Sequence, residues 1–93
     1  MYVRIVRFDG VTPERVESVV DRIKAEGPPP GNPVRKVQLF YDHWQETAVV
    51  LQFFGTDADM RKGAQQFADM DPGDTPGVRQ SVDMCGLAIE ARA

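Results

Sequence analysis

Four polar side chains that could do chemistry lie in segments whose apolar residues otherwise alternate as in β-strands: Arg4, Gln38, Gln52 and Asp83. Antiparallel pairing could bring Arg4 and Asp83 together on one face of a sheet. Gln38 and Gln52 would then lie on other strands of the same face. Such a polar cluster in apolar surroundings can orient a phenol, quinone or carboxylate, and its charged groups can assist proton transfer. The alternative interpretation is a cross-strand ion pair that fixes the register of an interface.

Other reactive residue types occur singly or in unsuitable positions. His43 is the single histidine and lies beside Trp44 in a short polar turn, where exposure to solvent is expected. The acidic run that begins at Asp69 departs from a calcium loop, because its sixth position is Asp74 instead of Gly and its twelfth is Gln80 instead of Glu. We therefore expect no metal and no cofactor.

The elements that position these residues follow from periodicity and turn signals. Alternating residues predict strands over 2–8, 34–41, 47–54 and about 79–90. Thr12 followed by Pro13 predicts the start of a helix that Gly27 ends, and Thr56 predicts the start of a second helix. The apolar stripes of the two helices are Val16, Val19, Val20 and Ile23 in the first, and Met60, Ala64, Phe67 and Ala68 in the second.

This order of elements predicts an α+β fold of ferredoxin-like type, βαββαβ. A right-handed crossover on each side of a central hairpin favours a four-stranded antiparallel sheet in the order 4-1-3-2, with both helices on one face. We expect the helices to cover Val3, Ile5, Val37, Leu39, Val49, Leu51, Phe53, Val82 and Met84.

The opposite face of this sheet is also rich in apolar side chains. On the same assignment it carries Tyr2, Val6, Phe8, Phe40, Val50, Phe54, Leu87 and Ile89, together with the four polar candidates. Leaving such side chains in water costs about 1.5–3 kcal/mol each relative to burial. An apolar patch of this extent usually marks an interface, so we expect a partner to cover it.

Composition narrows the class of protein. The 93 residues form one domain, 1–93, with a net charge of −3 and no cluster of Lys and Arg, which argues against nucleic-acid binding. The sequence contains no run of 18 apolar residues, so no membrane span is predicted, and its first residues do not have the pattern of a secretory signal. Cys85 is the single cysteine and is expected to be a small buried strand residue in a reducing cytoplasm.

In element order and size, and in the strand segments Tyr2–Phe8 and Thr47–Phe54, the chain resembles the dimeric α+β barrel proteins, which include the antibiotic-biosynthesis-type monooxygenases. The resemblance implies a homodimer whose two sheets face each other, with a cavity between sheet and helices or at the barrel rim. It implies no particular activity, because the members differ widely in chemistry. Haem-degrading relatives use a strand Asn and a helix His, whereas here Asn32 lies in a proline-rich connector and neither predicted helix contains His.

We therefore expect a cytoplasmic homodimer that binds a small hydrophobic or aromatic molecule without catalysis. Its ligand-binding candidates are Arg4, Gln38, Gln52, Phe54 and Asp83. The alternative is a cofactor-free monooxygenase acting on a phenol or quinol, in which Asp83 is the base and Arg4 stabilises the oxyanion. A third reading is a purely structural dimer with a closed barrel that holds no ligand.

Overall fold

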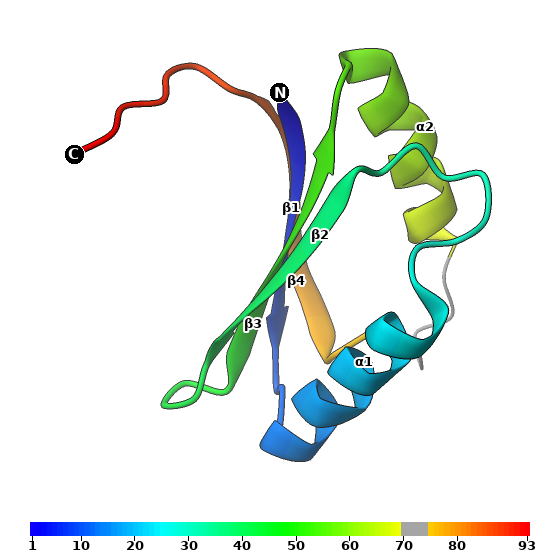
Figure 1. Ribbon diagram of the computed structural model, residues 1–93. Helices are drawn as coiled ribbons and strands as arrows, with labels where there is room; N and C mark the ends of the chain where they lie inside the picture. The colour runs from blue at the N-terminus through cyan, green and yellow to red at the C-terminus, as the bar shows by residue number, and fades with distance from the viewer. Residues whose placement is uncertain (70–74) are drawn as a thin grey trace.

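The computed structural model describes residues 1–69 and 75–93 of the chain. Within them the elements are β1 (Tyr2–Asp9), α1 (Pro13–Glu26), β2 (Lys36–Asp42), β3 (Thr47–Phe54), α2 (Asp57–Ala68) and β4 (Val78–Gly86). The predicted order of strands and helices is confirmed. The predicted end of the last strand is wrong, because β4 stops at Gly86 and residues 87–93 leave the sheet as an extended tail (Figure 1). Most of the predicted loop 71–77, and most of the acidic run from Asp69, lies outside the described residues.

The strands form one antiparallel sheet in the order β2-β3-β1-β4, which reads 4-1-3-2 from the β4 edge. Both helices lie on the same side of this sheet (Figure 1). The other side carries neither of them. This α+β arrangement of an open four-stranded sheet and two helices is compatible with a ferredoxin-like fold.

Local signals in the sequence set the ends of the helices. The Thr12 hydroxyl accepts a hydrogen bond from the Arg15 backbone N–H at 3.2 Å, and Thr56 caps α2 in the same way. Gly27 ends α1 at a φ of 67°, in the left-handed region that favours glycine, and its N–H donates to the Ile23 carbonyl at 2.9 Å. The predicted caps of both helices are therefore confirmed.

The assignment of sheet faces needs a correction for two strands. Arg4 pairs with Gln52 and Met84, so these three residues share a face, and that face is the one beneath the helices. Val3 and Ile5 consequently lie on the open face, opposite to the prediction, and the residues of β3 are inverted with them. The predicted faces of β2 and β4 are right. The pattern could not decide for β1 and β3, because both of their alternating sets are apolar.

The core beneath the helices is divided into two parts. One cluster, at the end of the sheet from which α1 begins, consists of Val6, Phe8, Val11 and Ala48, all at most 6% exposed. At the other end Phe54 of β3 and Met60 of α2 are buried against each other's elements, and Phe54 packs against Gly63 of α2. Arg4 and Gln52 occupy the stretch of β1 and β3 between these two parts.

The proline-rich connector between α1 and β2 is attached to α2 through Asn32. The Asn32 Nδ2 donates to Gln66 Oε1 at 2.8 Å, and its Oδ1 accepts from the Val34 backbone N–H at 2.9 Å. The connector therefore has a fixed position beside the space between the helices and the sheet.

Candidate functional site

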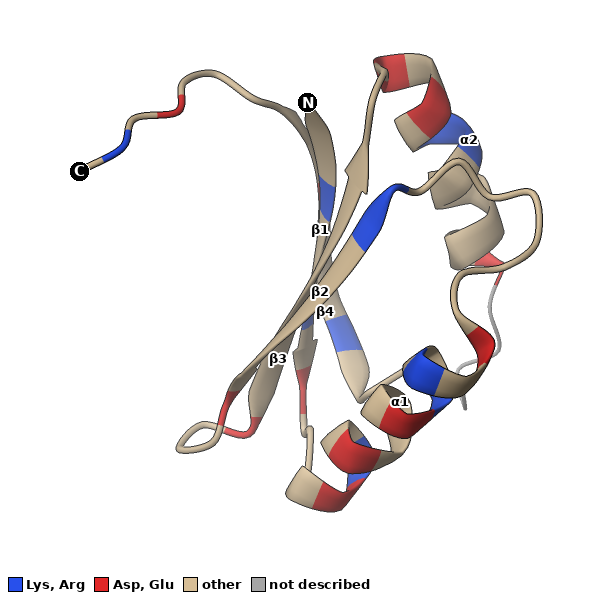
Figure 2. Cartoon of the chain, in the orientation of Figure 1, with Lys and Arg blue, Asp and Glu red and all other residues tan. Residues whose placement is uncertain are grey.

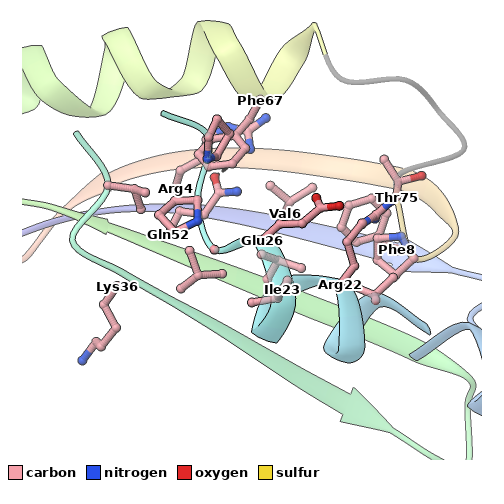
Figure 3. A pocket seen from close by; sticks show the side chains of 18 of the residues that line it. Arg4, Val6, Phe8, Arg22, Ile23, Glu26, Lys36, Gln52, Phe67 and Thr75 are labelled. Carbon is pink, nitrogen blue, oxygen red and sulfur yellow. Dashed lines mark hydrogen bonds between the residues drawn. The ribbon is translucent and has the colours of Figure 1, made fainter. Parts of the chain in front are cut away.

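A cavity of about 630 Å³ lies between the helices and the sheet. Much of its wall is apolar, including Val6, Val19, Val50 and Phe67, and the prolines of the connector add to it. Figure 3 shows lining side chains around this space, among them Val6, Ile23 and Phe67. The volume lies within the range of about 300–1,000 Å³ that is usual for small-molecule sites.

The buried polar group of this cavity is a pair formed by Arg4 and Gln52. Antiparallel pairing of β1 with β3 places the two residues directly opposite each other. Arg4 Nη1 donates a hydrogen bond to Gln52 Oε1 at 2.8 Å, and the side chains are 4% and 6% exposed. The guanidinium carbon lies 5.8 Å from the centre of the Phe67 ring, so Arg4 is held between this ring and Gln52 (Figure 3).

The electrostatic surroundings of Arg4 are unfavourable to its charge. Burial lowers the pKa of the Arg4 guanidinium, and the positive charge of Arg79 lowers it further. Arginine remains protonated in proteins at neutral pH, so the cavity contains a buried positive charge. Within residues 1–69 and 75–93, no carboxylate forms an ion pair with Arg4.

The structure brings together two of the predicted polar candidates and separates the other two. Gln38 pairs with Leu51 and Asp83 pairs with Ile5, so both lie on the open face of the sheet. The predicted contact between Arg4 and Asp83 is therefore wrong, because residues on opposite sides of a sheet cannot form a cross-strand pair. The register, in which Asp83 is one residue out of phase with Arg4, is the physical reason.

Phe54, the remaining predicted ligand contact, is packed in the core. It is fully buried beneath α2 and leaves no surface for a ligand. Phe67 and Arg79 line the cavity but were not among the predicted site residues. Phe67 was visible as part of the apolar stripe of α2, but no pattern in the sequence links Arg79 to Arg4.

The remaining reactive residue types do not gather around the cavity. His43 and Trp44 lie at the hairpin between β2 and β3 with their rings 5.9 Å apart, and the Trp44 side chain is 92% exposed. Cys85 is half-buried and pairs with Val3 on the open face. In the described part of the chain, no three His, Cys, Asp or Glu residues are arranged to hold a metal ion.

No helix or strand of residues 1–69 and 75–93 covers the open face of the sheet. Its apolar side chains are Val3, Ile5, Phe40, Val49, Leu51 and Phe53. Phe40 is 55% exposed, and Lys36 lies over the Phe53 ring with Nζ 4.5 Å from its centre. The polar residues of this face, among them Gln38 and Asp83, border the apolar ones.

Comparisons of the chain with protein-family models, with curated proteins and with solved structures gave no match. Neither helix in the described ranges is long and apolar enough to cross a membrane.

Proposed function

We propose that this protein binds a small, largely hydrophobic organic molecule in the cavity between the helices and the sheet, without catalysing a reaction. The observation that carries the proposal is the cavity of about 630 Å³, with its mainly apolar wall and a buried Arg4–Gln52 pair. Apolar walls with a few convergent polar groups are the usual composition of a small-molecule site.

The buried polar pair favours a ligand over a purely structural role for the cavity. Burying a charge without an ionic partner is costly, and an apolar pair at positions 4 and 52 would complete the core between its two clusters. A ligand that contacts Arg4 and fills the apolar space would offset that cost. A closed, ligand-free barrel supplies no such contact.

We also propose, from the resemblance to dimeric α+β barrels, that a second copy covers the open face of the sheet. Two sheets that pack face to face lie about 10 Å apart and bury the apolar side chains between them. The side chains at the centre of this face, Ile5, Leu51 and Phe53, are suited to that role. A cytoplasmic location remains a prediction from the single cysteine.

The alternative, a cofactor-free monooxygenase, has less support in the geometry. Its proposed base, Asp83, lies on the face opposite to Arg4 and cannot act on a molecule held by Arg4. Among the described residues that line the cavity, the one carboxylate belongs to Glu26, an exposed residue in the last turn of α1. We therefore place binding ahead of catalysis.

The test uses a matched pair of substitutions on β3. A panel of small aromatic acids and their neutral amides is titrated into ¹⁵N-labelled protein and followed by NMR. We expect at least one compound to shift the amide signals of cavity residues. Val50→Phe, which fills the cavity, should weaken that binding by about tenfold or more, whereas Val49→Phe on the open face should leave it unchanged.

Thermal unfolding and circular dichroism establish that both variants are folded. The proposal is wrong if no compound of the panel binds at millimolar concentration. It is also wrong if the binding is equally strong in Val50→Phe and in the wild type.

A further inference from the structure

We infer that the ligand of this cavity is an organic anion, an apolar body with one carboxylate group that Arg4 and Gln52 bind. This inference rests on the proposed function, since it names the chemical class of the molecule in the same cavity. It is carried by the donors that the two side chains still offer, by the charges around them and by the apolar remainder of the wall.

Arg4 has hydrogen-bond donors to spare. A guanidinium carries five N–H donors, and among the described residues the Arg4 side chain makes one hydrogen bond, from Nη1 to Gln52. In the described part of the chain, every side-chain nitrogen or oxygen atom that is shut off from solvent has a hydrogen-bond partner. The N–H groups of Arg4 that have no partner therefore reach accessible space. The accessible space at this position is the cavity, which Arg4 lines.

Gln52 adds donors of its own. Because its Oε1 accepts the hydrogen bond from Arg4, its Nε2 remains as a donor of two further hydrogen bonds. The pair therefore presents N–H donors to the cavity, and its one side-chain oxygen, Gln52 Oε1, already accepts a hydrogen bond. Two neighbouring donor groups match the two oxygens of one carboxylate, which an arginine binds in a bidentate manner.

The charges around the cavity also favour an anion. Arg79 lies close enough to lower the pKa of Arg4, so the two positive charges repel each other. The acidic residues of this acidic chain lie mainly along α1, at the start of α2 and at the hairpin (Figure 2). Among the described residues that line the cavity, Glu26 is the one acidic residue, whereas four arginines line it: Arg4, Arg22, Arg35 and Arg79. A bound carboxylate would relieve this repulsion within a site that water screens poorly.

The apolar part of the cavity wall determines the chemistry of the rest of the ligand. The apolar side chains of the wall include Val19 and Ile23 of α1 and Val50 of β3. These three side chains offer no hydrogen bonds, so a polar group placed against them would lose its hydration without compensation. An aromatic or branched aliphatic acid meets both requirements.

The test compares phenylbutyrate with phenylbutanamide, which has the same shape and no charge. Dissociation constants are measured by isothermal titration for the wild type, Arg4→Gln and Arg7→Gln. Arg7 is the matched control, because it is an arginine of the same strand that is exposed and lies on the open face. We expect the wild type to bind the acid about 10- to 100-fold more tightly than the amide.

In Arg4→Gln this preference for the acid should disappear while the amide still binds, and in Arg7→Gln it should persist. Equal binding of acid and amide by the wild type would refute the anionic ligand, a comparison that needs no variant to fold. A preference that survives in Arg4→Gln would also refute it. In both of these cases the amide still binds, so the proposed function stands. If neither compound nor any other member of the aromatic panel binds, the proposed function itself fails.

Discussion

At the scale of single residues, the unusual feature is a charged side chain in the middle of the covered face of the sheet. Arg4 and Gln52 share one hydrogen bond, but they interrupt the apolar contact between the two parts of the core. Polar residues that weaken a core are typical of sites at which a protein binds something. Their contribution to stability is therefore expected to be small or negative.

A double-mutant cycle tests this expectation. Removing one member of the pair leaves the other buried without its partner, whereas removing both leaves an apolar surface. We expect Arg4→Met and Gln52→Leu each to be less stable than Arg4→Met/Gln52→Leu, by about 1–2 kcal/mol in urea unfolding. The double variant should be at least as stable as the wild type. A double variant that is less stable than both single ones would contradict this account of the pair.

Gly63 is a second residue whose role is specific to its surroundings. A Cβ atom at this position would overlap the Phe54 ring and lie 2.9 Å from Asn32 Oδ1. Gly→Ala inside a helix usually stabilises by about 1 kcal/mol, but here we expect Gly63→Ala to destabilise by about 1–3 kcal/mol. Urea unfolding measures the change. Gln65→Ala, at an exposed position of α2, is the control and should not destabilise, and equal effects of both substitutions would contradict the packing argument.

At the scale of elements, the hairpin between β2 and β3 depends on one carboxylate. Asp42 Oδ1 accepts hydrogen bonds from the backbone N–H groups of Gln45 and Trp44 at 3.0 Å, and Oδ2 accepts from Gln45 Nε2 at 2.8 Å. The hydrogen bonds from Gln45, backbone first, and then that from Trp44 lower the pKa of Asp42 below 3.8. The ionised carboxylate therefore stabilises the folded turn.

The sign of the pH dependence follows from this lowered pKa. The stabilisation is fully present above the unfolded pKa of 3.8 and is lost as pH falls through the lower folded pKa. We expect Asp42→Asn to unfold at a lower temperature than the wild type at about pH 7, with the gap closing at about pH 2. Melting curves at both pH values measure it, and a gap of the same size at both would contradict the assigned role.

The elements also show how far the sequence could be interpreted. Caps, turns and periodicity predicted the strands and helices and their antiparallel order, because these signals are local. Which side chains of β1 lie beneath the helices was not predictable in the same way. Val3 and Ile5 on one alternation are as apolar as Val6 and Phe8 on the other, and each face has one arginine.

The same ambiguity explains the outcome for the candidate site. Arg4 and Gln52 were selected as polar exceptions in apolar strands, and the structure joins them. The prediction that Asp83 lies beside Arg4 depended on the strand register, which a single sequence does not determine. The depth of the cavity depends on how α1 lies over the sheet, which is a property of packing and leaves no local signal in the chain.

At the scale of the whole molecule, the two faces of the sheet differ in what covers them. The helices and the cavity occupy one, and the open face carries the apolar residues that we propose a second copy covers. Light scattering tests the dimer, and we expect the mass of two chains for the wild type. Leu51→Lys, which places a charge at the centre of the open face, should give one chain, whereas Ser18→Lys on the exposed side of α1 should not. A monomeric wild type at micromolar concentration would contradict the dimer.

The central claim, that a small molecule binds between the helices and the sheet, is tested most directly by locating a bound probe. Valine methyl groups are labelled with ¹³C, and nuclear Overhauser contacts to bound phenylbutyrate are recorded. We expect contacts to the methyl groups of Val6, Val19 and Val50, which line the cavity. Contacts confined to Val3 and Val49, on the open face, would contradict it.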